Sequence, residues 1–364
     1  MSGLEAELRG LIAEGGPISV ERYMELALGH PRFGYYRTRD PLGRAGDFVT
    51  APEISQMFGE LVGLWAALCW SAMGSPDPVR LVELGPGRGT LMADALRAAA
   101  ALPAFRAAID LDFVETSPVL RDLQTTAMAR SGVQGAWHDA VETVPAGPAI
   151  VLANEFFDAL PVRHYLRTHA GWCERLVGLS DGILAFGAAP DTEPSLKLDA
   201  PPGTILEVGI AARRMAAVLA ARVVREGGAV LIVDYGYAKP RFGETLQAVR
   251  RHRFVDVLAQ PGEADLTAHV DFSALGRAAR AAGAEVHGPA GQGAWLKALG
   301  LETRAEALKR QATPSQAEAI DAAVDRLTEA GTTERPGMGA LFKVMAFTAP
   351  GLPPPPGFEA MERQ

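Results

Sequence analysis

The chain has 364 residues, of which 48% are apolar and 21% charged, a composition typical of a soluble globular protein. At roughly 150 residues per domain, this length predicts two domains or one large α/β domain with insertions. The formal net charge is −8, from 43 acidic and 35 basic residues, so the chain lacks the basic footprint of a nucleic-acid-binding protein. No apolar run reaches the roughly 18 residues of a membrane span.

Neither the cysteines nor the histidines predict a metal site or a disulfide framework. Cys69 and Cys173 are the two cysteines, and each lies among apolar residues, so we expect two buried thiols. The histidines are too dispersed to form a ligand set. The first 16 residues carry three glutamates and no apolar core, which argues against a signal or transit peptide. We therefore expect a cytoplasmic protein.

The predicted elements begin with helices and continue as an alternating pattern. Apolar spacing predicts short helices over residues 4–14 and 19–29, a structured loop over 30–50 and an apolar helix over 54–73. Short apolar runs then predict strands over 79–84, 110–115, 150–153 and 230–234. Helices are expected between most of them, over 90–101, 118–130 and 205–226. Strands that alternate with helices predict βαβ units and a mostly parallel sheet.

Several segments interrupt this alternation. Residues 171–186 are expected to form a hairpin, 189–203 a Pro-rich connection and 296–330 an inserted helical subdomain, with further strands over 285–287 and 341–347. The predicted organisation is an N-terminal helical and lid region (1–75), a ligand-binding α/β domain (76–350) and a flexible tail (351–364). Insertions into the α/β domain are expected near 171–203, 236–268 and 293–335.

The most informative local pattern is a glycine-rich loop between the first predicted strand and the next helix. Gly85, Pro86, Gly87 and Gly89 make this loop, and Glu83 precedes it. The glycines allow a tight turn and a close approach of a ligand to the backbone, as in dinucleotide sites, but the GxGxG spacing differs from GxGxxG. A carboxylate there would repel a pyrophosphate and suits a cationic amine, such as the methionine moiety of S-adenosylmethionine (SAM). The alternative is a purely structural turn.

Two further acids follow the next two strands. Glu115, followed by Thr116, closes the second strand and could accept hydrogen bonds from the ribose hydroxyls; otherwise it caps the helix that follows. Asp139 could accept a hydrogen bond from the adenine amine, with Trp137 or His138 beside the ring; otherwise it is a solvated loop acid. Ligands of open α/β sheets bind at the carboxyl ends of the strands. The ordered set of Glu83, Glu115 and Asp139 therefore resembles the class I SAM-dependent methyltransferases.

Outside the loop, the sequence resembles a narrower family, the MidA-like methyltransferases. The matching blocks are GDFVTAPEISQMFGE at residues 46–60, NEFFDALP at 154–161, VDYGY at 233–237, DLTAHVDF at 265–272, and residues 338–343. Together they extend from about residue 20 to 347, nearly the whole chain. One departure is at residues 291–296, where alanine follows Gln-Gly in place of an expected phenylalanine.

The resemblance implies a fold, a reaction and a partner. The fold would be α/β and Rossmann-like, with a mostly parallel seven-stranded sheet whose last strand is antiparallel. The family includes a mitochondrial complex I assembly factor that dimethylates an arginine, so the resemblance implies an arginine side chain of a protein, such as a respiratory complex I subunit. Bacterial relatives with other acceptors stay open as an alternative. The chain also lacks an obvious twin-glutamate loop of the common arginine methyltransferases.

The expected catalytic residues lie after the fourth and fifth strands. Glu155 and Asp158 are the expected guanidinium anchors, and His269 or Asp271 an auxiliary acceptor or proton exit. The alternative is that these acids cap the segments that follow them. Asn154 is expected beside the cofactor. In the segment 40–47, Gly46 and Asp47 are expected to belong to a lid over SAM or, alternatively, to a plain loop.

Three functions from different classes fit these observations. The first is a SAM-dependent methyltransferase, acting on a protein arginine or on another side chain or small molecule. The second is a nicotinamide-dependent oxidoreductase, which the glycine spacing and Glu83 disfavour. The third is a non-catalytic SAM-binding assembly factor. Residues 250–253, the one basic cluster, are expected to be a solvated turn or a contact with an acidic partner.

Overall fold

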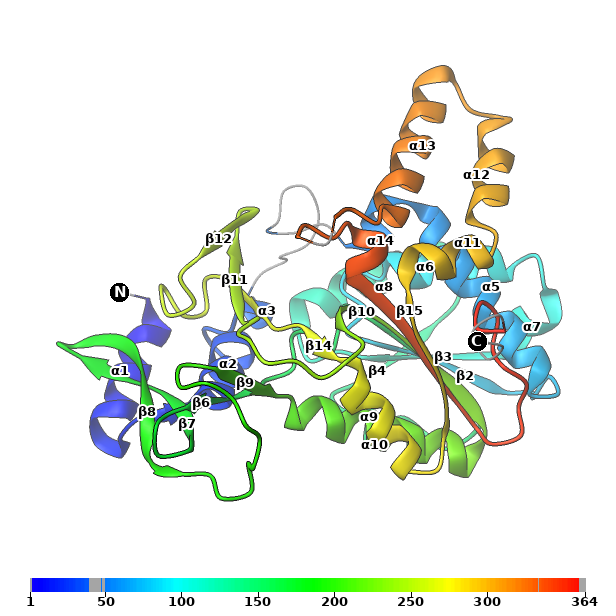
Figure 1. The fold of residues 1–364 in the computed structure, drawn as a ribbon. Coiled ribbons are helices and arrows are strands. Elements are labelled where there is room, and N and C mark those ends of the chain that lie inside the picture. The colour runs from blue at the N-terminus through cyan, green and yellow to red at the C-terminus, as the bar shows by residue number, and fades with distance from the viewer. Residues whose placement is uncertain (1, 39–46, 48–49, 333, 360–364) are drawn as a thin grey trace. The chain divides into compact units, whose positions relative to one another are not determined.

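The computed structural model describes residues 2–38, 47, 50–332 and 334–359, and it divides into two compact units (Figure 1). The first unit consists of residues 1–48, 158–214 and 239–271, and the second consists of 49–157, 215–238 and 272–364. This division differs from the expected boundary near residue 75. Residues 158–214 and 239–271, which were expected to belong to the sheet domain, belong instead to the unit that contains the N-terminal residues.

The second unit is built on a seven-stranded sheet in the order β15-β16-β10-β5-β2-β3-β4. Strands β10, β5, β2, β3 and β4 are parallel, as the alternating pattern predicted, and β16 is antiparallel to both of its neighbours, as the family resemblance implied. The chain runs outward from β2 to β3 and β4 and then returns to β5 on the other side of β2. The topological switch point of the sheet therefore lies between β2 and β5. The strands are β2 (Val79–Leu84), β3 (Ile109–Val114), β4 (Gly135–His138), β5 (Ala149–Asn154), β10 (Gly228–Tyr237), β15 (Glu285–Gly291) and β16 (Phe342–Thr348).

Helices cover both faces of this sheet. Apolar residues of α5 and α6, such as Trp65 and Leu96, are buried in one core with sheet residues such as Leu81, Phe113 and Leu152. Helix α10 lies against β10 and β16. The helices of this unit are α4 (Ala51–Ile54), α5 (Gln56–Ala72), α6 (Thr90–Ala99), α7 (Pro103–Ala108), α8 (Pro118–Ser131), a 3₁₀ turn (Val141–Thr143), α10 (Phe272–Ala281), α11 (Gln292–Ala298), α12 (Leu301–Lys309), α13 (Pro314–Thr328) and α14 (Met338–Leu341).

The insertion near residues 293–335 is helical, and the segment after β16 is packed. Helices α12 and α13 form a hairpin that projects from the second unit (Figure 1). Phe358 is fully buried, and a Cβ at Gly357 would lie 2.6 Å from the Trp295 ring. Residues 351–359 are therefore held to the core by Phe358, in contrast to the expected loose tail, while 360–364 lie outside the described residues.

The first unit combines helices with two antiparallel sheets. Strands β1, β7, β6 and β9 form one sheet, to which β8 pairs through β7, and β12, β11 and β13 form the other. Tyr23, Met24 and Val177 are fully buried in its core. The elements are α1 (Gly3–Gly15), β1 (Ile18–Ser19), α2 (Val20–Gly29), α3 (Tyr35–Thr38), β6 (Arg163–Arg167), β7 (Trp172–Ser180), β8 (Ile183–Thr192), β9 (Ile205–Val208), β11 (Gln247–Arg250), β12 (Arg253–Val255), β13 (Asp265–Thr267) and β14 (Val270–Asp271).

One predicted helix is wrong at its start. Residues 205–226 were expected to be helical throughout, but residues 205–208 form β9 and α9 begins at Ile210 (Ile210–Glu226). The strand pairs antiparallel with β6, from Arg163 opposite Val208 to Leu166 opposite Ile205. Four apolar or charged residues ahead of a helix carry no period of their own, so the pairing with β6 decides their structure.

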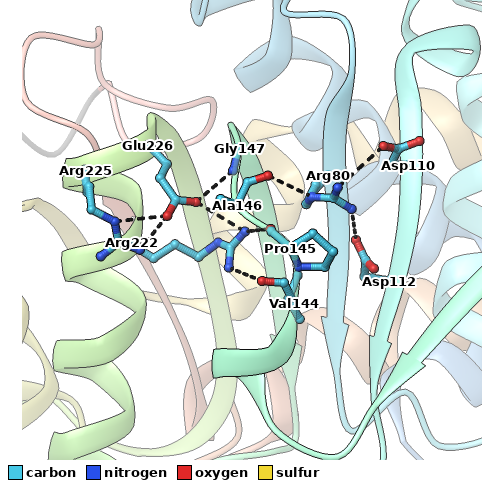
Figure 2. A network of polar contacts seen from close by, with 10 residues as sticks. All are labelled: Arg80, Asp110, Asp112, Val144, Pro145, Ala146, Gly147, Arg222, Arg225 and Glu226. Carbon is cyan, nitrogen blue, oxygen red and sulfur yellow. Dashed lines mark hydrogen bonds and ion pairs between the residues drawn. The ribbon is translucent and has the colours of Figure 1, made fainter.

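A polar network joins the strand starts in the second unit, at the opposite end from the expected site (Figure 2). Arg80 pairs with Asp112 at 3.0 Å and donates a hydrogen bond to a backbone carbonyl ahead of β5. Glu226, at the end of α9, accepts a hydrogen bond from the Gly147 N–H and pairs with Arg222 at 3.4 Å. These contacts hold together the strands β2 and β3, the residues before β5 and the end of α9.

Candidate functional site

The glycine-rich loop between β2 and α6 adopts the left-handed backbone that glycine allows. Gly85, Gly87 and Gly89 have φ values of 59°, 55° and 79°. A Cβ at Gly85 would lie 3.0 Å from the Phe156 ring, so the loop has no room for a side chain at that position. Gly89 is the N-cap of α6 and provides no side-chain cap. The first N–H groups of α6 therefore face the loop without a capping side chain.

Two buried oxygen acceptors lie at the ends of the strands that flank the switch point. Glu83, in β2, is 3% exposed, and its Oε2 has no hydrogen-bond partner among the described residues. Burial raises the pKa of the Glu83 carboxyl well above its usual range. Asn154 ends β5, and its Oδ1 likewise finds no partner in the described part of the chain. A buried acceptor without a donor is costly, so both oxygens fit a donor supplied by a ligand.

Glu115 follows β3 and is held in place by two hydrogen bonds. Its Oε1 accepts the Ser117 N–H at 2.7 Å, and its Oε2 accepts the Gln124 side-chain amide at 3.2 Å. Burial raises the pKa of Glu115, and these hydrogen bonds offset part of that rise. Ser117 is itself the N-cap of α8, so Glu115 does not cap the helix directly. Thr116, in contrast, is exposed.

Gln124, which sequence reasoning missed, links three parts of the expected cofactor site. It lies on α8, is fully buried, and donates hydrogen bonds to the Gly87 carbonyl at 2.8 Å and to Glu115. Its Oε1 accepts the indole N–H of Trp137 at 2.8 Å. All the hydrogen-bonding capacity of the amide nitrogen is directed at the glycine-rich loop and the second acid. A polar residue on the buried face of α8 was the available signal.

His138 ends β4 and Asp139 follows it, and their side chains make different contacts. The His138 ring places Nε2 at 2.8 Å from Asp112, so His138 extends the polar network of Arg80. The Asp139 side chain is 82% exposed and pairs with Arg121 at 2.7 Å. Their expected roles beside adenine stay predictions.

Glu155 occupies an unusual backbone conformation at the end of β5. Its φ is 50°, a left-handed value that non-glycine residues adopt rarely. The Glu155 N–H is bonded to the Val233 carbonyl at 2.9 Å. Its Oε1 accepts the Ala51 N–H at 3.1 Å and the Asn154 amide at 3.2 Å. The surroundings thus fix both the strained backbone and the carboxylate, and such strain concentrates at functional sites.

Glu53 is a second residue that sequence reasoning did not single out, although it lies in the first family block. It lies on α4 and accepts a hydrogen bond from the Thr90 hydroxyl at 2.9 Å. It also pairs with Arg88 at 3.7 Å. Glu53 therefore holds the last residues of the glycine-rich loop and the first residue of α6.

The other expected catalytic residues belong to the first unit. The Asp158 carbonyl accepts the Ala268 N–H at 3.0 Å, which brings Asp158 beside the residue that precedes His269. The His269 N–H donates to the Thr245 hydroxyl at 2.9 Å. Asp271 ends β14 and is half-buried. The first unit thus joins Asp158 to the segment that carries His269 and Asp271.

Asp265, the first residue of the DLTAHVDF block, forms a buried polar cluster near Asp158. The Tyr36 hydroxyl donates a hydrogen bond to Asp265 at 2.8 Å, and both Asp158 and Asp265 are buried. Burial, with further contributions from Asp158 and Asp47, raises the pKa of Asp265 to about 8. Burial, followed by the carboxylates of Asp265 and Asp158, raises the pKa of Tyr36 well above its usual range.

Of the expected lid residues, Asp47 is described, whereas Gly46 lies outside the described residues. Asp47 accepts hydrogen bonds from the Tyr35 hydroxyl and the Arg251 N–H, both at 2.6 Å. Its carboxylate therefore ties α3 to the β11–β12 turn within the first unit.

The chain matches a family of known methyltransferases. Residues 61–290 match the family model Methyltransf_28, which describes S-adenosyl-L-methionine-dependent methyltransferases. The chain is 39% identical to the Drosophila melanogaster "Protein arginine methyltransferase NDUFAF7 homolog, mitochondrial", over 94% of this chain and 84% of that protein. It is 37% identical to the human "Protein arginine methyltransferase NDUFAF7, mitochondrial", over 82% and 73% of the two chains.

A solved structure is similar over nearly the whole chain. It is a COG1565 superfamily member from Burkholderia thailandensis bound to S-adenosyl-homocysteine. It is 30% identical, covers 98% of this chain and 94% of its own, and superposes with a TM-score of 0.83. The fold, the glycine-rich loop and these matches define a class I SAM-dependent methyltransferase. The chain belongs to the MidA-like family of these enzymes, which includes the NDUFAF7 proteins, and its cofactor is SAM.

Two kinds of site are absent from the described residues. No described helix combines the length and the hydropathy needed to cross a membrane. No described group of three His, Cys, Asp or Glu side chains is arranged to hold a metal ion.

Proposed function

We propose that the protein methylates an arginine side chain of a protein substrate. The observation that carries this proposal is Glu155, whose carboxylate is fixed on a strained backbone at the end of β5. Relatives at 37–39% identity are named protein arginine methyltransferases. The resemblance described above further implies a respiratory complex I subunit as the substrate. A cytoplasmic location stays a prediction.

The proposed contacts with SAM use hydrogen-bond acceptors of the second unit. The Glu83 carboxylate and the Asn154 carbonyl receive the donors of the methionine moiety, because both oxygens are buried without partners in the described chain. Gly85, Gly87 and Gly89 allow the left-handed backbone of the loop that the ligand would approach. Glu115 receives the ribose hydroxyls while Gln124 and the Ser117 N–H hold it in position.

Bound SAM supplies an electrophilic methyl group on a sulfonium, whose leaving group requires no proton. The residues of the chain therefore have to align the acceptor nitrogen and stabilise the charge of the transition state. A guanidinium is protonated at any physiological pH, since its pKa exceeds about 12. The Glu155 carboxylate orients this cation and draws its charge away from the attacking nitrogen, which can then lose its proton after transfer.

Asp158 is the second proposed anchor, and its surroundings in the first unit favour a cation. Asp265 has a pKa of about 8 because it is buried near Asp158 and Asp47. A guanidinium beside these carboxyl groups would favour their ionised forms and return the pKa of Asp265 toward its usual value. His269 or Asp271 accepts or passes on the proton that leaves the methylated nitrogen.

The test begins with incubation of the purified protein with labelled SAM and cell lysate, followed by mass spectrometry of the labelled protein. Methylarginine is the expected product. Label on another side chain would reject the arginine assignment, and SAM binding with no labelled protein would favour a non-catalytic assembly factor.

The Glu155→Gln variant then tests the anchor on the substrate so identified. The glutamine keeps the Oε1 that accepts the Ala51 N–H but removes the charge. We expect SAM binding to change little and turnover to fall at least about 100-fold, which corresponds to about 2.7 kcal/mol of barrier. Glu142→Gln, at an exposed acid of the same unit, is the matched control. Turnover of the Glu155 variant within a few-fold of the control would remove Glu155 from the mechanism.

A further inference from the structure

The β11–β12 hairpin presents basic and aromatic side chains on the surface of the first unit. Residues 251–256 are all exposed, and Phe254 is 76% exposed, the largest exposed fraction among the large apolar residues that the structure describes. Arg250 and Arg253 pair across the hairpin, with Arg251 and His252 as the turn. Arg250 contacts Gln260 and lies 3.7 Å from Glu263. The side chains of Arg251 and Arg253 make no ion pair with the described residues.

The turn holds its basic residues in a backbone conformation that does not suit them. Arg251 and His252 have φ values of 51° and 59°. A two-residue hairpin turn of this kind favours Asn-Gly, because both positions are left-handed. Arg251 and His252 thus occupy a strained conformation that other residue pairs would adopt at lower cost, and such strain concentrates at functional sites.

The turn is also fixed in place. The Arg251 N–H donates to the Asp47 carboxylate at 2.6 Å, and the His252 N–H donates to the Asp47 carbonyl at 3.2 Å. These contacts use only backbone groups of the turn, and the Arg251 and His252 side chains are exposed. Two hydrogen bonds thus hold the backbone of the tip while its side chains remain accessible.

The outer edge of β12 adds backbone groups to this surface. Among the described residues β12 pairs with β11 and with no other strand. An edge strand carries unpaired donors and acceptors that an extended peptide can bind. Phe254 lies in the middle of this strand, where it offers an apolar contact between the charges of the turn and the strand edge.

We propose that the β11–β12 hairpin is a docking arm for an acidic, extended segment of the protein substrate. The proposal rests on the proposed function for the identity of the partner as a protein substrate. Arg251 and Arg253 bind the acidic side chains, and Phe254, which follows Arg253 in β12 and so lies on the other face of the strand, packs on an apolar residue of the same segment. The chain carries a net charge of −8, so an acidic partner needs such a local positive patch to bind. Attraction of this kind acts within about 10 Å at ordinary salt concentrations.

The test measures binding of a fluorescent 12-residue peptide that carries acidic residues around one arginine. The comparison peptide has serine at each acidic position. We expect the parent protein to bind the acidic peptide at least about tenfold more tightly at low salt, with the difference shrinking at high salt. Arg251→Glu/Arg253→Glu should remove this preference, and Phe254→Ser should weaken binding about three- to tenfold.

A matched control separates local contact from net charge. Arg130 and Arg326 are exposed arginines of the second unit with no ion pair among the described residues, and Arg130→Glu/Arg326→Glu makes the same change in net charge. We expect this control to bind the acidic peptide within about twofold of the parent. Equal loss in both double variants, or no loss in Arg251→Glu/Arg253→Glu, would overturn the proposal. Tighter hairpin-dependent binding to RNA or to anionic vesicles than to the peptide would also overturn it.

Turnover distinguishes this proposal from the proposed function. On the identified substrate protein, Arg251→Glu/Arg253→Glu should raise KM at least about tenfold and leave kcat and the Kd for SAM within about twofold. An unchanged KM would overturn the docking arm while arginine methylation stands. A protein that methylates no arginine, yet binds the acidic peptide through Arg251 and Arg253, would reject the proposed function alone.

Discussion

Replacing Gln124 by methionine tests whether one buried amide organises the cofactor site. The change keeps the volume of the side chain and removes its hydrogen bonds to the Gly87 carbonyl (2.8 Å), Glu115 Oε2 (3.2 Å) and the Trp137 N–H (2.8 Å). We expect the glycine-rich loop and Glu115 to lose their common support. SAM should therefore bind more weakly although Gln124 is not proposed to contact it.

The magnitude follows from the burial of the three partners. A neutral hydrogen bond contributes about 1 kcal/mol, and one to a charged group about 1.5–3 kcal/mol. Glu115 is buried, whereas Gly87 and Trp137 are half-buried, so water can replace part of their loss. We expect about 2–3 kcal/mol lower unfolding free energy, a drop in Tm of roughly 4–12 °C. The Kd for SAM should rise about 10- to 100-fold.

Calorimetric titration with SAM and thermal unfolding measure the two effects. Thr125→Met, at the next and exposed position of α8, introduces the same side chain as a control. Gln124→Glu keeps an acceptor for Trp137 but loses both donors and places a second carboxylate beside Glu115, so it should impair SAM binding at least as much. A folded Gln124→Met variant with a Kd within twofold of the parent would refute the reasoning.

Three further outcomes are expected. The affinity for SAM should rise as the pH rises through the raised pKa of Glu83, because the ligand amine favours the ionised carboxylate. Below that pKa, SAM binding should release a proton from Glu83. Calorimetry in several buffers measures both effects, and Glu83→Gln should abolish them. Asp265 has a folded pKa of about 8, above its unfolded value, so its contribution to stability is complete below pH 4 and is lost as pH rises toward 8. The unfolding free energy should fall by up to about 1.4 kcal/mol per pH unit in that window, and an equally steep fall in Asp265→Asn would contradict this assignment. Arg251→Asn/His252→Gly should raise the unfolding free energy by about 0.5–1 kcal/mol in denaturant titration, and a lower value would show that the turn is not strained.

Local pattern predicted the centre of the second unit well. The strand at residues 79–84, the glycine-rich loop and the helix from Thr90 follow one another within about 20 residues, so their order alone defines the structure. The parallel sheet with an antiparallel β16 was also predicted. The resemblance to a known family supplied the number of strands and the orientation of β16.

Features that depend on distant partners could not be predicted. Gln124 contacts residues 37 and 13 positions away, and helical periodicity indicates only that it lies on a buried face. The pairing of β9 with β6 overrode the helical pattern of residues 205–208. The first unit joins three separate segments of the chain, and no composition change marks their boundaries.

The place of β16 in the sheet has a consequence for synthesis of the protein. β16 lies between β15 and β10 and pairs with β10 from Phe342 to Thr348, so neither neighbour has its partner until about 110 residues after β10 have been made. At 5–20 residues per second, translation leaves the apolar edge of β10 open for roughly 5–20 s. An open apolar edge is a template for wrong pairing. Nascent chains therefore need protection at this edge until residue 348 has left the ribosome.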